Sequence, residues 1–139
     1  MRRPQPAAER AAALVDAATA YERSSRRRYV ERIPVRRRDE VVIVPVRQIA
    51  SVVADGELLH ITTLAKEQFT ITHRLQALEA RLDPRRFVRL GRGTLANLDA
   101  IATVSPMPGG TYLATLSNGQ QLHVSRIQSR VLRETLLKL

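Results

Sequence analysis

The pattern of apolar and polar positions divides the chain into two parts. Over residues 7–28, small apolar residues recur three or four positions apart, which predicts an amphipathic helix with a narrow apolar stripe. From Tyr29 onward the period shortens, and short runs of β-branched residues are separated by turn residues. We therefore expect a basic N-terminal arm and linker helix over residues 1–28, followed by a mainly β domain over residues 29–139.

Short runs in the second part have the length and composition of β-strands. Asp55-Gly56 and Asn118-Gly119 each lie between two such runs, and both are dipeptides favoured in two-residue hairpin turns. Pro45 has no N–H to donate, so its strand is expected at a sheet edge or is expected to end there. A short strand is expected to begin at residues 87–88. The other expected strands cover residues 30–35, 41–46, 49–54, 58–63, 67–72, 100–104, 111–116 and 121–124.

A short internal helix is predicted over residues 73–82. Leu75, Leu78 and Leu82 fall on one face at helical spacing. The expected helix signals are Thr72 or His73 as the N-terminal cap and Asp83-Pro84 as the stop.

A C-terminal helix is predicted from about residue 126 to residue 137. Ser125 followed three residues later by Gln128 matches the capping box, in which each side chain bonds a free backbone N–H of the first turn. The apolar positions expected to face inward are Ile127, Val131, Leu132 and Leu136.

The charge of the chain favours a polyanionic partner and is unevenly distributed. The formal net charge is +10, and 21 of the 23 basic residues are arginine. Residues 1–38 have a net charge of +7, residues 39–86 of −1 and residues 87–139 of +4. Nucleic acid is the first candidate partner and an anionic membrane the second. The excess of arginine fits bidentate phosphate or guanine contacts, or else reflects a GC-rich coding sequence.

Several classes of protein are excluded or disfavoured by what the sequence lacks. Without cysteine there is no disulfide, Cys-ligated zinc site, iron–sulfur cluster or thiol catalysis. The longest apolar run, residues 41–44, is far shorter than the roughly 20 residues of a membrane helix. The N-terminus shows no signal-peptide pattern. We therefore expect a soluble cytoplasmic protein with no membrane partner.

No catalytic or metal-binding constellation is recognisable. His60, His73 and His123 do not have the spacing of a metal site, so we interpret each as structural. The chain contains neither a Gly-x-Ser-x-Gly nucleophile turn nor a Gly-x-x-x-x-Gly-Lys phosphate loop. We expect neither enzymatic activity nor a cofactor or metal.

One segment has an unusual composition: residues 87–101, FVRLGRGTLANLDAI, place two arginines and two glycines between apolar residues. This segment resembles the hallmark of the LytTR DNA-binding domain family, roughly Phe-x-Arg-x-His-Arg-Ser-x-x-Val-Asn-x-x-x-Ile. The resemblance extends over about residues 30–137. It includes a strand–acidic turn–strand at 49–63, a leucine-rich helix at 74–84, and the segments 115–119 and 124–126 before the last helix.

The resemblance implies a mainly antiparallel β domain with a short internal helix and a C-terminal helix, which binds duplex DNA through loops that enter successive major grooves. By position, Arg92 and Arg126 are expected to contact base edges. The turn containing Gly56 and Glu57 is a third contact point. The residues expected in the supporting or phosphate-facing shell are Arg89, Asn97 and Arg130.

The chain departs from the family pattern at Gly91 and Gly93, where the family has histidine and serine. The loss of two polar side chains implies lower affinity or a changed sequence preference. Our leading expectation is a bacterial transcriptional regulator that binds double-stranded DNA sequence-specifically. The alternatives are a protein-interaction module that kept the fold and lost specific DNA contacts, and a basic RNA-binding β domain.

Two partner expectations stay open beside DNA: a homodimer on paired sites and a regulatory partner protein. The chain resembles a DNA-binding domain without the receiver domain that many relatives have. It is therefore either a protein that acts alone, or one in which residues 7–28 are part of a linker.

Overall fold

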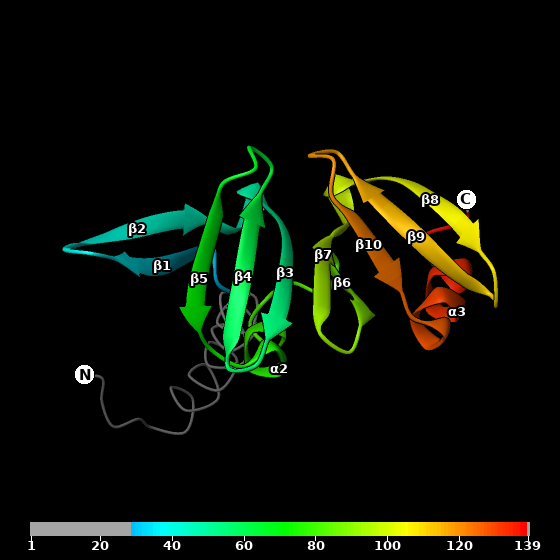
Figure 1. The fold of residues 1–139 in the computed structure, drawn as a ribbon, viewed down its shortest axis with the longest axis horizontal. Helices are drawn as coiled ribbons and strands as arrows, with labels where there is room; N and C mark the ends of the chain where they lie inside the picture. Colours follow the sequence, from blue (N-terminus) through cyan, green and yellow to red (C-terminus); the bar gives the residue numbers. More distant parts are fainter. Residues whose placement is uncertain (1–28, 139) are drawn as a thin grey trace, which may run out of the picture.

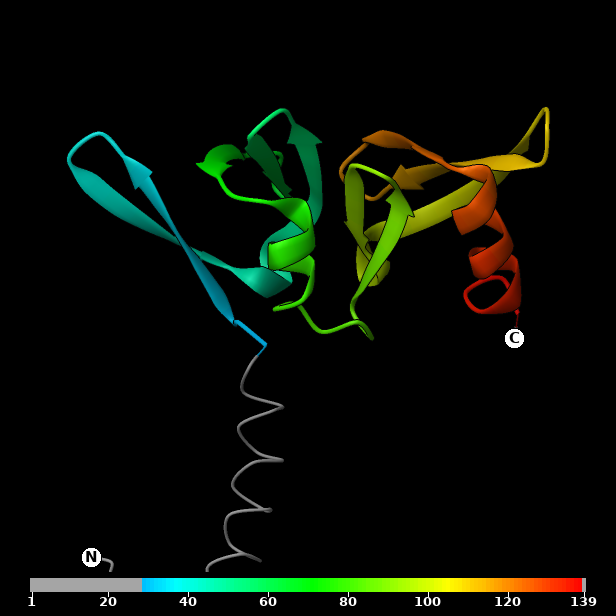
Figure 2. The same ribbon diagram turned by 90° about the horizontal axis from the view of Figure 1, so that it is seen from below.

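Three antiparallel sheets packed as successive layers make up residues 29–138, the part of the chain that the structure, a computed structural model, describes (Figure 1). Figure 2 shows the same succession of layers from below. The mainly antiparallel β class expected from the sequence is confirmed. The arm and linker helix expected over residues 1–28 lie outside the described residues.

The first layer, which we call the hairpin sheet, pairs β1 (Arg32–Arg37) with β2 (Glu40–Pro45). Alternation explains its orientation, because Ile33 and Val35 are buried against the next layer while Pro34 between them and the arginines on either side are exposed. The guanidinium of Arg37 lies 4.6 Å from the centre of the Phe69 ring and fixes the hairpin to the neighbouring sheet. As expected, β2 ends at Pro45, where a single 3-10 turn (Val46–Gln48) begins.

The central sheet has five strands in the order β5-β4-β3-β7-β6. Four consecutive residues of β3 are buried, from Ile49 to Val52, because this strand has a layer on each of its faces. The pairing of β6 with β7 was not predicted, since the sequence indicated only a short strand that begins at residues 87–88 and no strand at β7. The strands are β3 (Ile49–Asp55), β4 (Leu58–Thr63), β5 (Gln68–Thr72), β6 (Phe87–Gly91) and β7 (Thr94–Asn97).

The C-terminal sheet has three strands, and α3 (Arg126–Glu134) packs beside it. A 3-10 turn, Leu98–Ala100, leads from the central sheet into this layer. The strands are β8 (Ile101–Met107), β9 (Thr111–Leu116) and β10 (Gln121–Val124).

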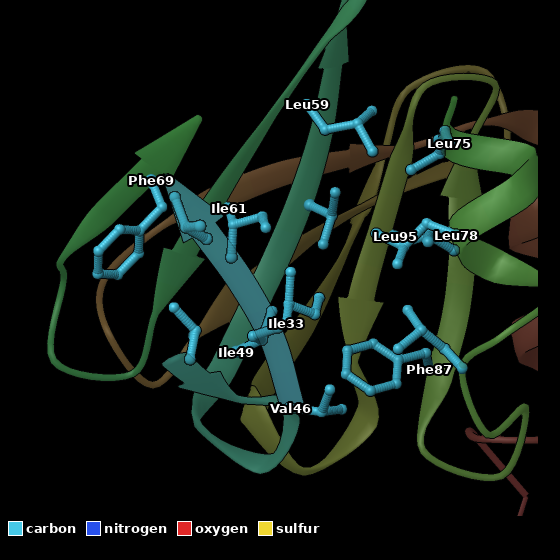
Figure 3. Close-up of a cluster of buried hydrophobic side chains, with 14 residues drawn as sticks. Ile33, Val46, Ile49, Leu59, Ile61, Phe69, Leu75, Leu78, Phe87 and Leu95 are labelled. Carbon is cyan, nitrogen blue, oxygen red and sulfur yellow. The ribbon is translucent and has the colours of Figure 1, made fainter. Parts of the chain in front are cut away.

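Two apolar clusters fill the spaces between the layers. The larger one lies between the hairpin sheet, the central sheet and α2 (Leu75–Glu79). Figure 3 shows Leu75 and Leu78 of this helix directed at side chains of the central sheet. The smaller cluster joins the other face of the central sheet to the C-terminal sheet and α3, and it includes Leu90, Leu116 and Leu132.

Two details of the internal helix differ from the prediction. It is shorter than 73–82, although Leu75, Leu78 and Leu82 are buried as expected. Its N-cap residue is Arg74, which makes no side-chain capping bond, so the expected cap at Thr72 or His73 is wrong. Thr72 is instead the last residue of β5, where it pairs with Leu58.

The C-terminal helix begins at the predicted residue but presents a different face to the core. Ser125 is the N-cap and accepts a hydrogen bond from the Gln128 N–H at 3.2 Å, as expected. Leu132 is fully buried, but the other residues expected to face inward, Ile127, Val131 and Leu136, are exposed. The sheet covers only the side of α3 that holds Ser129 and Leu132. The buried face therefore shares only Leu132 with the apolar stripe expected from the sequence.

Two hairpin turns lie close to their predicted positions. The β3–β4 turn is Gly56-Glu57, one residue later than the expected Asp55-Gly56, because Asp55 still pairs with Leu58. Gly56 has φ +62°, which favours glycine. The β9–β10 connection contains Asn118 and Gly119 as expected and is longer than two residues.

Buried polar contacts join the β9–β10 turn to the central sheet, and we call this group the inter-sheet clamp. Asn118 Nδ2 donates to the Thr63 carbonyl at 3.0 Å and to Gln120 Oε1 at 3.0 Å. Ser51 Oγ donates to the same Gln120 oxygen at 2.8 Å. These contacts fix the C-terminal sheet relative to the central sheet.

Within residues 29–138, no helix combines the length and the apolar character needed to cross a membrane.

Candidate nucleic-acid interface

Three connecting segments lie side by side along one edge of the central and C-terminal sheets, which we call the loop edge. The segments are the β3–β4 turn, the β6–β7 turn and the start of α3. The Ala54 N–H donates to the Gly93 carbonyl at 2.8 Å, and the Ser125 N–H donates to the Leu90 carbonyl at 2.8 Å. The loop edge is lowermost in Figure 1 and faces the reader in Figure 2. The structure therefore brings together segments that are up to 70 positions apart in the sequence.

Arg92 lies in the two-residue turn between β6 and β7. Its side chain makes no hydrogen bond or ion pair with other residues in the range 29–138, and the residue is exposed. The turn is held at both ends by the antiparallel ladder, in which Gly91 pairs with Thr94. Arg92 is thus a cation at the tip of a fixed hairpin and not part of an open loop.

Arg89 supports this turn from behind. Its Nε and Nη2 donate to Glu79 Oε1 of α2, at 3.2 and 2.8 Å. Its Nη1 donates to the carbonyl oxygens of Arg92 and Gly91. The guanidinium thus connects α2 to the turn, and only 22% of the side chain is exposed.

Glu79 was not singled out from the sequence. It lies ten positions before Arg89, on a different element, and no local spacing connects the two. Only the packing of α2 against the central sheet brings this carboxylate to the arginine.

Arg126 is the first residue of α3, directly after the Ser125 cap, and it is exposed. A methyl group on Gly109, in the β8–β9 turn, would lie 3.9 Å from Arg126 Nη2, so this turn is a neighbour of the arginine. Arg130 follows one helical turn later on the same face and is also exposed. The free N–H groups at the start of α3 add a partial positive charge beside Arg126.

The β3–β4 turn places Gly56 and Glu57 at the loop edge, and both residues are exposed. This end of the edge is acidic, because Asp55 adds a second carboxylate. His60 Nε2 lies 3.2 Å from Asp55 Oδ2, so one carboxylate of the turn has a partner on the central sheet.

Asn97 lies away from the loop edge, and 3% of it is exposed. Its Nδ2 donates to the Ile49 carbonyl at 2.9 Å, and its Oδ1 accepts the Asp99 N–H at 3.0 Å. Both polar atoms of the amide are therefore used to fix the start of the C-terminal layer. Among the site residues expected from the sequence, Asn97 is the one that the fold encloses.

Asp83 lies in the segment that leads into β6. The Arg85 N–H donates to Asp83 Oδ1 at 2.9 Å, and this bond lowers the pKa of the carboxyl below its usual 3.8. The carboxylate thereby fixes the turn before the arginine-bearing hairpin. Within residues 29–138, no group of three or more His, Cys, Asp or Glu side chains is arranged to hold a metal ion.

Comparisons with known proteins agree on one family. The model of the LytTr DNA-binding domain matches residues 39–137. The sensory transduction protein LytR of Streptococcus agalactiae is 32% identical over 108 residues, which are 77% of this chain and 43% of that protein. The chain thus spans less than half the length of this relative.

A solved LytTr DNA-binding domain from Bacillus cereus has the same fold. It superposes with a TM-score of 0.70 at 21% sequence identity, over 77% of this chain and 97% of the other.

Proposed function

This chain belongs to the LytTR DNA-binding domain family, and on that premise we propose that it is a bacterial transcriptional regulator that binds double-stranded DNA sequence-specifically. The loop edge is the surface that enters the major groove. We call the three exposed segments of the loop edge the tips: the β3–β4 turn, the β6–β7 turn and the start of α3. The single observation that supports this assignment best is that backbone hydrogen bonds join the three tips in a row and that two of the tips present an arginine.

The chemistry of each tip suits a base edge in the major groove. A guanidinium donates two parallel hydrogen bonds to O6 and N7 of guanine, and this is the role we assign to Arg92 and Arg126. The acidic β3–β4 turn is repelled by phosphates. Glu57 is therefore assigned to a base, where a carboxylate accepts from the N4 amino group of cytosine.

The remaining site residues act around these contacts. Arg130 is exposed one turn beyond Arg126, and we assign it to a phosphate. Arg89 is a positioning residue, since its donors are occupied by Glu79 and the β6–β7 turn. Gly56 allows the tight turn that presents Glu57, and Asn97 fixes the start of the C-terminal layer from inside the fold.

We further propose binding as a homodimer on paired sites, with a regulatory partner protein as the source of the input. A regulator of bacterial transcription acts in the cytoplasm, where the chromosome is. Half-sites contacted by two copies are expected about one helical turn apart.

The test is selection of bound sequences from a random pool of duplexes, followed by titrations with Arg92→Ala and Arg126→Ala. Each substitution is expected to weaken binding to the selected duplex by roughly 5- to 150-fold, the equivalent of ~1–3 kcal/mol, and to relax preference at one base pair. Binding to an unrelated duplex should fall much less. Fluorescence anisotropy at two salt concentrations measures the affinity for the selected duplex and for the unrelated duplex.

Arg47→Ala is the matched control, because this exposed arginine precedes β3 at the end opposite the β3–β4 turn. It should leave base preference unchanged. An arginine substitution that lowers affinity equally for all sequences is not at a base contact. Binding that shows no sequence preference and disappears at moderate salt would contradict the regulator and favour the interaction module or the RNA-binding domain.

A further inference from the structure

The most exposed large apolar side chain in the described part of the chain is Ile127, at 71%. It is the second residue of α3 and follows Arg126 directly. Ser129 and Leu132 face the sheet, and Ile127 is about 200° around the helix from Ser129, so its side chain projects away from the protein. Within residues 29–138, this apolar surface stays largely uncovered.

The position of Ile127 is set as firmly as that of Arg126. The Ser125 N–H donates to the Leu90 carbonyl, and the Ser125 hydroxyl accepts the Gln128 N–H. The first turn of α3 is thus fixed both to β6 and by its own cap. A surface that receives Arg126 therefore also receives Ile127.

The charge around Ile127 favours DNA over a second copy of the chain as its occupant. Of the charged residues of α3, Arg126, Arg130 and Arg133 are basic, and Glu134, in its last turn, is the single acid. Two such helices packed together would bring like charges into contact, whereas the phosphates beside a major groove would neutralise them.

We propose that Ile127 recognises a thymine, by packing on its C5 methyl group in the major groove beside the base that Arg126 contacts. The inference rests on the proposed function and adds a specificity determinant to it. Thymine is the only base that presents a methyl group in the major groove, and aliphatic side chains contact it without hydrogen bonds. Covering one methyl group corresponds to about fourfold in affinity, the equivalent of ~0.8 kcal/mol.

The experiment replaces each thymine of the selected duplex singly with deoxyuridine, which lacks only the C5 methyl. For the wild-type protein, one replacement should weaken binding about three- to fivefold, as measured by anisotropy. Ile127→Ala should weaken binding to the thymine duplex by a similar factor and bind the thymine and deoxyuridine duplexes equally. Ile127→Val should discriminate thymine from deoxyuridine less than the wild type and more than Ile127→Ala.

Leu64→Ala is the control, because Leu64 is 42% exposed and follows β4 at the end opposite the loop edge. It should discriminate thymine from deoxyuridine as the wild type does. Because Ile127 is exposed, its variants should keep the wild-type melting temperature, and this is checked first.

The outcomes separate the two proposals. If selection enriches no sequence, the proposed function fails and this inference fails with it. If a sequence is enriched but Ile127→Ala discriminates deoxyuridine as the wild type does, only the inference fails. If Ile127→Ala instead abolishes self-association in sedimentation experiments without DNA, the surface joins copies of the chain and the thymine contact is wrong.

Discussion

At the scale of single residues, the arginines of the loop edge differ because their guanidinium groups have different partners. Arg89 is held by a carboxylate and two backbone carbonyls, so its hydrogen-bonding capacity is largely used within the protein. Arg92 and Arg126 are exposed and make no such bonds within residues 29–138. The family resemblance left Arg89 in a supporting or phosphate-facing shell, and only the structure shows which partners occupy its guanidinium.

The pair of Glu79 and Arg89 gives a prediction at this scale. Glu79→Gln removes the charged partner of Arg89, loosens the β6–β7 turn and should weaken specific DNA binding severalfold without changing which bases are preferred. The loss of folding stability should be at most about 1 kcal/mol, because the pair is partly exposed. Anisotropy and thermal melting measure the two effects.

Glu67→Gln is the control for the change in net charge, since Glu67 is exposed and precedes β5 at the end opposite the loop edge. If Glu79 acts through the turn, Glu79→Gln should have little further effect in an Arg92→Ala background. Full additivity of the two substitutions would refute the positioning role.

At the scale of elements, the backbone conformation of each turn decides which glycines are required. Gly56 has φ +62°, whereas Gly91 does not have a positive φ, and a methyl group at either position would contact nothing within 4 Å. Gly56→Ala should therefore destabilise the fold by about 1–2 kcal/mol through backbone strain alone. Gly91→Ala should be neutral or stabilising by up to ~1 kcal/mol.

Chemical denaturation of the two alanine variants measures this difference directly. Equal losses of stability at both positions would contradict the prediction that the positive φ of Gly56 makes glycine necessary there. Gly91 stands where the family has histidine. The Gly91→Ala protein also tests whether the backbone flexibility of this glycine lowers the affinity for DNA. If it does, the alanine variant should bind more tightly.

Elements with strong local patterns could be predicted from the sequence. The elements against which they pair or pack could not. The strands from residue 49 to residue 72 were predicted to within a residue or so, because alternation and turn residues agree there. The β6–β7 hairpin was missed because β7 is four residues long and Gly91 and Gly93 interrupt the pattern. The predicted burial was wrong at Ile127 and Val131 of α3 and at Leu136 beyond its end, since an apolar stripe does not specify which face a neighbouring sheet covers.

At the scale of the whole molecule, the distance between the tips depends on how the central and C-terminal sheets are joined. Gly56 and Arg92 belong to the central sheet, whereas Arg126 follows the last strand of the C-terminal sheet. The inter-sheet clamp lies at the opposite edge from the tips, at the top of Figure 1. The clamp therefore helps to set the separation between the first and last tip, together with the smaller apolar cluster and the Ser125–Leu90 backbone bond.

Asn118→Ala tests this relation. Removal of the amide leaves the Gln120 N–H without its acceptor and the Thr63 carbonyl with only the Lys66 N–H as a donor, and the expected destabilisation is about 1–3 kcal/mol. Affinity for the selected duplex should fall more than affinity for an unrelated duplex, because only specific binding requires the spacing of the tips to match the spacing of the base pairs. Calorimetry and paired titrations measure these quantities.

Gln121→Ala is the control on the same hairpin, because this residue is exposed. A loss in Asn118→Ala that is equal for specific and unrelated duplexes would show that the clamp supports the fold without setting the spacing of the contacts.

Each tip lies on its own element, two on hairpin turns and one at the start of a helix, and this has a consequence for how the proposed binding preference changes over evolution. Arg92, Glu57 and Arg126 occupy positions whose backbone is fixed by strand pairing or a helix cap, and none of them contributes to either apolar cluster. On the proposed function, a substitution at one tip therefore alters one base preference and leaves the core and the other tips unchanged. New recognition sequences can arise one base pair at a time, through intermediates that all remain folded.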